Sequence, residues 1–335
     1  MRGCCVWKKD LLDNLLIYAY YIEKSEYKRE TMKDVLIIGG VAGGATAAAR
    51  VRRLSKDVRI TILEAGPDIS FANCGLPYYI GGDIQSRSKL ILQSPESFRD
   101  QYDVEVKIET EAVNIDRKAK IVTALHKPTG NEMTYHYDAL ILAQGGKPVV
   151  PPLPGVEKDH VFSLWTLGDM DRIYDFIEVE EPRTAVVVGA GFIGIEMVEA
   201  LKKRGLEVAV VERMPHVMPN LPAEIAGLLH RELEAYGIGV HTSLGVTEIT
   251  DNDVVLDDGS SVNADMVLIS VGVKPTLDLA QRAGLALGDA GGLLVDKHLR
   301  TSDENIYGVG DMVEIEHKIS GNKVRIPLAG PANRQ

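Results

Sequence analysis

Cysteine is scarce in this 335-residue chain, positive charge is not in excess, and no apolar run is long enough to cross a membrane. The three cysteines, Cys4, Cys5 and Cys74, have no regular spacing, which excludes a disulfide framework and a zinc site, and the eight histidines show no metal spacing. The apolar run at residues 15–22 is too short to span a bilayer. A net charge of −11 disfavours nucleic acid as a partner. We therefore expect a cytoplasmic protein without a nucleic-acid, membrane or metal partner.

The rest of the composition, 45% hydrophobic and 25% charged, is ordinary for a globular protein, and the length favours about two domains. Because the net charge repels anionic cofactors, helix N-termini and a few basic side chains must hold them locally. Residues 1–31 differ from the rest, with a basic start and an apolar run. Asp13 and Asn14 interrupt the apolar part and no small-residue cleavage site follows. A short amphipathic helix or a misplaced start codon before Met32 is therefore expected rather than a secretory signal.

Two strand–helix–strand patterns recur along the chain, which indicates an internal duplication of one nucleotide-binding architecture. The first is expected at residues 35–38, 43–54 and 58–64, and the second at residues 185–188, 192–204 and 207–212. Weaker strands follow each pattern, and four prolines between residues 148 and 154 form a stiff connection between the two halves.

The second glycine loop carries the complete dinucleotide fingerprint. Gly189 allows the tight turn, Gly191 lets the backbone approach a pyrophosphate, and Gly194 lets the helix pack against the strand. Glu212, 18 residues past Gly194, is expected to bind ribose hydroxyls. Arg213 follows it directly and would attract a 2′-phosphate, so NADH and NADPH both remain open.

The first glycine loop, residues 39–44, keeps the outer glycines but has Val41 in the middle position. Glu64, 20 residues past Gly44, supplies a carboxylate for a ribose. Asp311, after a glycine-rich turn, supplies a further acceptor. A late acid that returns to the first site suits FAD, whose ribityl chain carries extra hydroxyls. We therefore predict FAD at the first loop and NAD(P)H at the second.

Cys74 lies between the two loops, before Gly75, Leu76 and Pro77. Proline is favoured in a first helical turn, and the dipole at a helix N-terminus favours a thiolate. No second cysteine lies nearby, so the sulfur must alternate between a thiolate and a bond to something other than a protein cysteine. This pattern predicts an enzyme that passes electrons from nicotinamide to flavin to thiol.

A basic cluster ends the first predicted helix. Its members are Arg50, Arg52, Arg53 and Lys56. The favoured interpretation is that these cations complement the helix dipole. The alternative is a phosphate-binding patch for an anionic thiol substrate.

These residues resemble the pyridine nucleotide-disulfide oxidoreductases, over residues 32–335. The resemblance is greatest to the single-cysteine branch that contains coenzyme A-disulfide reductases, NADH oxidases and persulfide reductases. The most specific motif is Ser-Phe-Ala-Asn-Cys-Gly-Leu-Pro-Tyr at residues 70–78. The first glycine loop, with valine in the middle, and Ile-Pro-Leu-Ala-Gly-Pro-Ala-Asn-Arg-Gln at residues 326–335 are similar to further blocks of the family.

The resemblance implies an FAD-dependent NAD(P)H oxidoreductase in which Cys74 is the redox nucleophile. Its substrate would be a low-molecular-weight disulfide such as coenzyme A disulfide, or a persulfide. An NADH oxidase or peroxidase acting through a cysteine sulfenic acid, and a truncated non-catalytic flavin-binding remnant, are the alternatives. Phe192 matches a gate over the nicotinamide pocket, and Glu196 an acid beside the nicotinamide.

The expected site residues fall into three groups. For FAD they are Gly39, Gly40, Val41, Ala42, Gly43, Gly44, Glu64, Ala143, Gly145, Gly310 and Asp311. For NAD(P)H they are Gly189, Gly191, Phe192, Ile193, Gly194, Glu196, Glu212, Arg213 and Gly272. For the coenzyme A substrate they are Thr46, Arg53, Ser70 and Asn73.

The predicted fold is α/β, with two Rossmann-like domains of the glutathione reductase type in three layers. Residues 1–31 form an atypical extension, residues 32–150 together with 276–335 the FAD-binding domain, and residues 151–275 the NAD(P)-binding domain. Full-length relatives continue past the position of Gln335 into an interface domain that forms a homodimer and lends residues to the partner's active site. The chain is expected to lack that domain.

Overall fold

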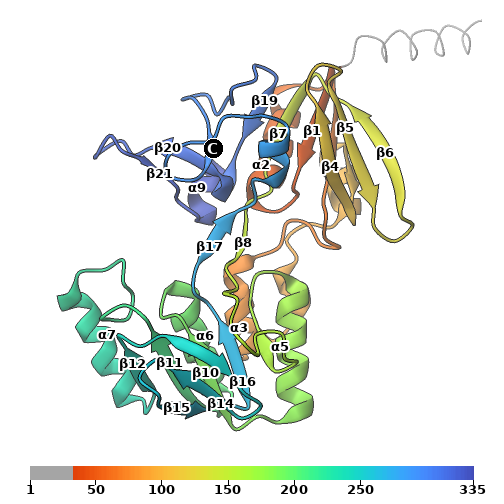
Figure 1. Ribbon diagram of the computed structural model, residues 1–335. Coiled ribbons are helices and arrows are strands. Elements are labelled where there is room, and N and C mark those ends of the chain that lie inside the picture. The colour runs from red at the N-terminus through yellow and green to blue at the C-terminus, as the bar shows by residue number, and fades with distance from the viewer. Residues whose placement is uncertain (1–32) are drawn as a thin grey trace, which may run out of the picture.

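The structure, a computed structural model, describes residues 33–335, so the predictions for residues 1–31 lie outside it. Figure 1 shows two lobes. The first and last parts of the described chain meet in a terminal lobe (residues 33–145 and 276–335), and the middle of the chain forms a central lobe (residues 149–272). Two antiparallel strands, β8 (Gly146–Pro148) and β17 (Val273–Pro275), connect the lobes.

The terminal lobe is built on a five-stranded parallel sheet. Its order is β19 (Ile306–Gly308), β7 (Ala139–Leu142), β1 (Lys33–Ile38), β2 (Val58–Leu63) and β3 (Val104–Lys107). Strand β1 is buried on both faces. Val35 and Ile37 pack with helix α2 (Ala42–Leu54), whereas Leu36 and Ile38 pack with the antiparallel sheet on the other side. The lobe therefore has three layers: helix, parallel sheet and antiparallel sheet.

The central lobe repeats this plan. Its parallel sheet has the order β12 (Gly239–Thr242), β11 (Glu207–Glu212), β10 (Thr184–Val188), β16 (Met266–Ile269) and β9 (Val161–Phe162). Ala185 and Val187 pack with the helices, and Val186 and Val188 face a second antiparallel sheet. The predicted duplication is therefore visible in the order of layers as well as in the loops.

The smaller elements complete the two lobes. The three-stranded sheets are β4 (Thr110–Asp116), β5 (Ile121–His126) and β6 (Asn131–His136); β13 (Val246–Ile249), β14 (Asp253–Leu256) and β15 (Ser261–Asn263); and β18 (Leu293–Leu294), β20 (Val313–Glu316) and β21 (Lys323–Val324). The remaining helices are α3 (Leu76–Ile80), α4 (Pro95–Tyr102), α5 (Leu167–Glu180), α6 (Phe192–Lys203), α7 (Ala223–Ala235), α8 (Asp278–Arg282) and α9 (Ala329–Arg334), with short 3-10 turns η1 (Asn73–Gly75), η2 (Arg87–Leu90) and η3 (Gly310–Met312).

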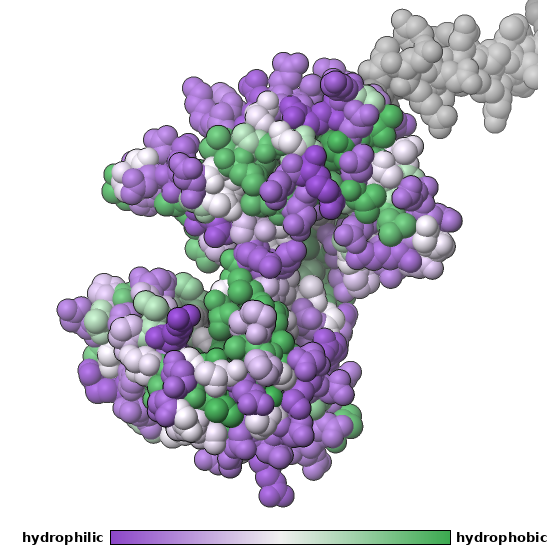
Figure 2. All heavy atoms as spheres, viewed as in Figure 1, coloured by the Kyte–Doolittle hydropathy of each residue, from purple (hydrophilic) through white to green (hydrophobic). Residues whose placement is uncertain are grey.

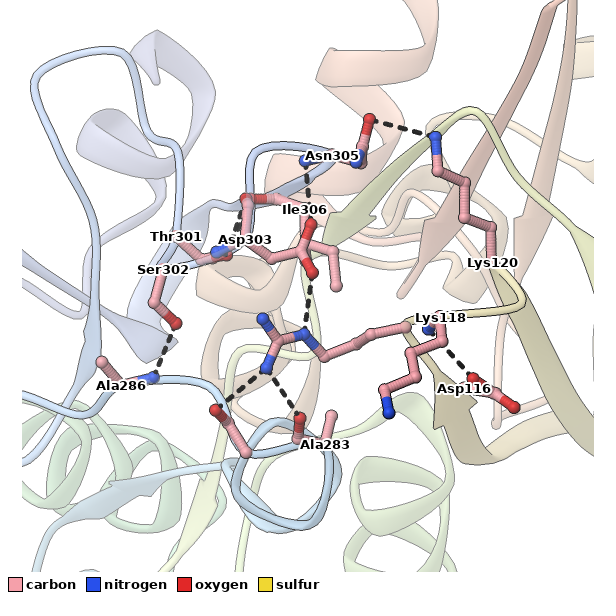
Figure 3. Close-up of polar contacts among 12 residues, drawn as sticks. Asp116, Lys118, Lys120, Ala283, Ala286, Thr301, Ser302, Asp303, Asn305 and Ile306 are labelled. Atoms are coloured by element: carbon pink, nitrogen blue, oxygen red, sulfur yellow. Dashed lines mark hydrogen bonds and ion pairs between the residues drawn. The ribbon is translucent and has the colours of Figure 1, made fainter.

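Within the terminal lobe, a polar clasp fastens residues 283–305 to the turn between β4 and β5 (Figure 3). The Arg117 guanidinium, in the turn between β4 and β5, donates to Asp303 at 2.7 Å and to the carbonyls of Ala283 and Gly284. Lys120 reaches Asn305 at 3.3 Å. Although burial opposes ionisation of Asp303, the hydrogen bonds from Arg117 and from the Asn305 N–H outweigh it and lower the pKa of Asp303. The clasp thus fixes the segment that leads into β19.

Replacing Arg117 by alanine should lower the free energy of unfolding by about 1–3 kcal/mol at neutral pH, because it strips a partly buried carboxylate of its partner. The Asp303 pKa is lower in the folded than in the unfolded chain, so its contribution is present above the unfolded pKa of about 3.9 and is lost as the pH falls through the folded pKa. Urea unfolding across this range should show the wild type and Arg117→Ala converging in acid. Lys118→Ala is the matched control, and a gap that stays constant with pH would contradict the clasp.

Candidate functional site

Each parallel sheet presents a helix that approaches its strand more closely than a side chain would allow. A Cβ on Gly44 would lie 1.8 Å from the Gly39 carbonyl oxygen, and one on Gly194 would lie 2.0 Å from that of Gly189. Gly39 and Gly189 both have φ of +101°, a backbone conformation that favours glycine. The two loops therefore have the same shape, although Val41 stands where the second loop has Gly191.

The amide groups that begin α2 and α6 are not used by side-chain caps. Neither helix has a side-chain hydrogen bond at its N-cap, whereas α4 and α5 are both closed by a capping box. The first amides of a helix have no partner within the helix, and the helix dipole favours negative charge there. Both helices thus offer free donors that fit the pyrophosphate of a dinucleotide.

A carboxylate stands in the same position at the end of β2 and of β11: Glu64 directly follows β2, and Glu212 is the last residue of β11. The Glu64 oxygens accept from the backbone N–H groups of Gly40 and Gly66 at 2.7 and 2.8 Å. The Glu212 oxygens accept from those of Ala190 and Met214 at 2.8 and 2.9 Å. Each oxygen keeps a second acceptor position, which fits the hydroxyls of a ribose.

The first predicted site opens into a cavity of about 390 Å³ with walls from both lobes. Figure 2 shows that the surface is indented between the lobes. Nine of the eleven predicted FAD residues line it: Gly39, Val41, Ala42, Gly43, Glu64, Ala143, Gly145, Gly310 and Asp311. Gly40 and Gly44 shape the loop behind it instead. Burial raises the pKa of Glu64 and that of Asp311. Hydroxyl donors from a bound ligand would favour their charged forms.

Several residues of this cavity were not expected from the sequence. They are Ala65, Gly66, Pro67 and Asp68 after β2; Thr110, Glu111 and Ala112; Gln144 and Gly146; Trp165, Thr166, Leu167 and Gly168 at the start of α5; and Thr276 and Ala332. The Thr-x-x-Asp sequence at residues 166–169 could have predicted the start of α5, because it is a capping box. It carries no signal that this helix end faces the cavity.

The second predicted site lies on the central lobe. Gly191 is the N-cap of α6, and Phe192, its first residue, is 58% exposed. Ile193, Gly194 and Glu196 lie in the first turns of α6, Glu212 ends β11 with Arg213 exposed beside it, and Gly272 follows β16 with φ of +125°. Burial, with a smaller effect of Glu199, raises the pKa of Glu196.

A second cavity, of about 730 Å³, lies along the outer side of α2. Thr46, Arg53 and Ser70 line it, whereas the fourth predicted substrate residue, Asn73, lines the first cavity. Both cavities have Gly43 and Ala332 in their walls, so they adjoin. The backbone of Ser70 is strained, with φ of +44°.

The basic cluster at the end of α2 divides by role. Arg52 donates to the carbonyls of Tyr102, Lys56, Val58 and Asp103, which is a structural use. Arg50 and Arg53 line the second cavity, and Arg53 also lies over the Tyr102 ring at 5.8 Å. Dipole complementation thus does not describe the whole cluster, because two of its cations face a cavity.

Cys74 is exposed and lies within η1, just before α3, rather than in front of a single helix. It belongs to the Cys74 segment, residues 70–92, whose ends are joined by hydrogen bonds from Ala72 to Leu90 and from Leu92 to Ser70. Cys74 lines neither cavity, but the preceding residue, Asn73, lines the first. The exposed thiol therefore belongs to the residue that follows one wall residue of the first cavity.

Comparison with known proteins decides the family. The family model for pyridine nucleotide-disulphide oxidoreductases matches residues 33–335. The chain belongs to this family. The predicted family and the predicted α/β fold with two dinucleotide-binding domains are thereby confirmed.

The chain is similar to relatives with more than one activity. It is 36% identical over 304 residues to the NADH oxidase of Methanocaldococcus jannaschii. It is 33% identical over 303 residues to the coenzyme A disulfide reductase of Staphylococcus haemolyticus. Each match covers 90% of this chain, and they cover 67% and 68% of those two proteins, respectively. Among solved structures, reduced CoADR-RHD of Bacillus anthracis (41% identity, TM-score 0.89) and a NAD-dependent persulfide reductase of A. fulgidus (38%, 0.88) match 90% of this chain. The chain spans 55% and 57% of their lengths.

Two features common in other proteins are absent from residues 33–335. Among these residues, no helix is both long and apolar enough to cross a membrane. The same part of the chain brings together no group of three side chains suited to hold a metal ion.

Adding a methyl group at the helix–strand contact should damage the first site. Gly44→Ala should lower the free energy of unfolding by roughly 3 kcal/mol and weaken FAD binding at least about tenfold, because its Cβ would overlap a backbone oxygen. Gly227→Ala, inside α7, is the matched control. A Cβ there would meet only the end of the Arg231 side chain, at 3.9 Å, so the change should stabilise the protein by about 0.5–1 kcal/mol. Chemical unfolding and FAD fluorescence measure both effects. Unchanged FAD affinity in Gly44→Ala would contradict a role of this close contact in shaping the FAD site.

The raised pKa of Glu64 makes FAD binding depend on pH. Ribose hydroxyls that donate to this carboxylate favour its charged form, so binding releases a proton. The affinity of the apoprotein for FAD should be steady at higher pH and fall as the pH drops through the raised pKa. A titration from about pH 8 to about pH 5 measures this, starting well above the ordinary carboxyl range. Glu212→Gln should keep the dependence. Glu64→Gln should weaken it, and the double variant Glu64→Gln, Asp311→Asn should lose it, because the pKa of Asp311 in the same cavity is also raised. A dependence lost in Glu212→Gln and kept in the double variant would refute the assignment.

Proposed function

We propose that the chain is the catalytic body of an FAD-dependent NAD(P)H oxidoreductase that reduces a low-molecular-weight disulfide through Cys74. One observation carries the proposal. The cysteine of residues 33–335, Cys74, is exposed and follows a residue that lines the first dinucleotide cavity, and its segment packs against the lobe that carries the second glycine loop. Residues 32–150 and 276–335 would form the FAD-binding domain, and residues 151–275 the NAD(P)-binding domain.

The reaction requires Cys74 to act as a nucleophile. Its thiolate attacks one sulfur of the substrate disulfide, a sulfur–sulfur bond forms with Cys74, and the other half leaves as a thiolate. When bound, FAD and NAD(P)H supply the two electrons that cleave this mixed disulfide. Cys74 returns as a thiolate and, with one proton taken up overall, two thiols are formed for each NAD(P)H oxidised. Asn73 precedes Cys74 in the sequence, and its side-chain amide donates to the Trp165 carbonyl at 3.5 Å. This contact holds the first residue of η1 against the central lobe.

The second cavity supports a substrate with phosphate groups. Arg50 and Arg53 give its wall positive charge, and Thr46 and Ser70 add hydroxyl groups. Coenzyme A disulfide has both the phosphates that such a wall would bind and the sulfur that Cys74 would attack. The cavity adjoins the first cavity through Gly43 and Ala332, which would let the nucleotide part lie along α2 while the thiol part reaches Cys74.

The nucleotide site favours NADH in this proposal. Glu212 is buried and held by two amides, so its carboxylate would bind a free ribose 2′-hydroxyl and repel a 2′-phosphate. Arg213 is exposed and leaves NADPH as a weaker donor. A cytoplasmic setting is part of the proposal, because the reaction leaves free thiols.

Cys74→Ser should separate the two halves of the reaction. Stopped-flow reduction of the FAD-loaded protein by NADH should stay within about twofold, whereas reoxidation by coenzyme A disulfide should fall roughly a thousandfold because the nucleophile is gone. The double variant Cys4→Ser, Cys5→Ser is the matched control and should behave as the wild type. Full disulfide turnover in Cys74→Ser would refute the mechanism.

Two alternatives have specific support and the same experiment separates them. Similarity to an NADH oxidase supports oxygen or peroxide as acceptor, with Cys74 oxidised to a sulfenic acid. Similarity to a persulfide reductase supports attack on a persulfide. Fastest reoxidation by oxygen or by a persulfide would replace the disulfide as substrate. Bound FAD with no reoxidation by any of the three would identify a flavin-binding remnant.

A further inference from the structure

The Cys74 segment starts from the terminal lobe but packs on the central lobe. Its base is held by the hydrogen bond from the Ser70 N–H to the Gly40 carbonyl. Beyond the base, Leu76, Ile80 and Leu90 join the core that α5 and α6 form with the central sheet. Figure 1 shows α3 beside these two helices. The segment is thus a third connection between the lobes, besides β8 and β17.

The fit against α6 is close. A Cβ on Gly81 would lie 3.1 Å from the Cα of Ala200, so the end of α3 touches the backbone of α6. Asp83 forms an ion pair with Lys203 at 2.9 Å. On the α5 side, the rings of Tyr79 and Tyr174 lie 5.2 Å apart. Helices α5 and α6 of the central lobe therefore hold the part of the segment that follows Cys74.

Arg87 connects the terminal lobe, the Cys74 segment and the central lobe. Arg87, in η2, donates through Nε and a terminal nitrogen to both oxygens of Asp171 on α5, at 2.8 to 3.0 Å. The same guanidinium lies 3.8 Å from Asp68. Asp68 belongs to the loop after β2 and lines the first cavity. Arg87 thus joins the Cys74 segment to the loop after β2 in the terminal lobe and to the first turns of α5 in the central lobe.

We propose that Arg87 is a positioning residue that sets the place of Cys74 relative to the first cavity, by fixing the Cys74 segment to Asp171 on one side and to the Asp68 loop on the other. This deepens the proposed function and rests on it. A two-pronged arginine–carboxylate pair defines direction as well as distance. Thr166 to Gly168, at the start of α5, line the same cavity, so the Asp171 contact ties the segment to a wall of the FAD site.

The exposure of the pair distinguishes this role from plain stabilisation. The side chains of Arg87 and Asp171 are 37% and 36% exposed, so their ion pair adds little to the stability of the fold. The geometry of the pair should affect the reaction instead, because a small displacement of the Cys74 sulfur would slow its attack on the substrate. Removing it should therefore leave the protein folded and change the behaviour of Cys74.

The test compares Arg87→Ala with Arg59→Ala. Arg59 makes a similar two-pronged pair with Asp34, at 2.6 and 2.8 Å, away from the Cys74 segment. Alkylation of Cys74 is followed by mass spectrometry of its peptide in the FAD-loaded protein. Arg87→Ala should alkylate roughly two- to fivefold faster, the range that loss of one partly exposed ion pair allows. Arg59→Ala should match the wild type.

Stopped-flow half-reactions provide the second readout. Reoxidation of Arg87→Ala by coenzyme A disulfide should slow roughly tenfold, while reduction by NADH and FAD affinity stay near wild type. Arg87→Lys, which keeps the charge but loses the two-pronged geometry, should lie between. The proposal is overturned if Arg87→Ala and Arg59→Ala agree in both readouts. If the wild type reduces no disulfide, the proposed function fails, but the alkylation comparison still decides the role of Arg87.

Discussion

The close contact between glycine backbones is the constraint on which the rest of this structure depends. In each lobe the helix that follows the glycine turn, α2 or α6, lies very near that turn. A Cβ on Gly44 or Gly194 would therefore enter the space of a carbonyl oxygen. This closeness aims the uncapped helix N-terminus at the edge of the sheet and brings the carboxylate of the next strand against the turn. Two dinucleotide cradles with the same hydrogen-bond pattern follow from it.

Local signals explain how much could be predicted from the sequence. The strand at residues 35–38, the helix after Gly39 and the acid at Glu64 depend on neighbours within one strand–helix–strand unit, so their spacing was enough. The remaining walls of the first cavity come from segments far apart in the sequence, such as the start of α5 and Ala332. Their placement depends on how the lobes pack, and no local pattern encodes it. The same holds for half of the Arg52 contacts: the carbonyls of Lys56 and Val58 are nearby in the sequence, but those of Tyr102 and Asp103 lie about 50 residues away.

The arrangement of the Cys74 segment was the least predictable feature. The motif predicted a reactive cysteine, but not that Leu76 and Ile80 would complete the core of the other lobe. This packing relates the duplicated fold to the proposed reaction. Each nucleotide site belongs to one lobe, whereas Cys74 lies on a segment that starts from one lobe and packs on the other, as the proposed electron transfer to its thiol requires. The adjoining cavity along α2 then offers room for a substrate with phosphate groups.

The central claim is that Cys74 forms a transient bond to the substrate sulfur and that NAD(P)H electrons release it. Mass spectrometry of the FAD-loaded protein tests this directly, after mixing with coenzyme A disulfide in the absence of oxygen and again after adding NADH. The account predicts one coenzyme A on the Cys74 peptide before NADH and none afterwards. An adduct that survives NADH, or that forms only on Cys4 or Cys5, would contradict it.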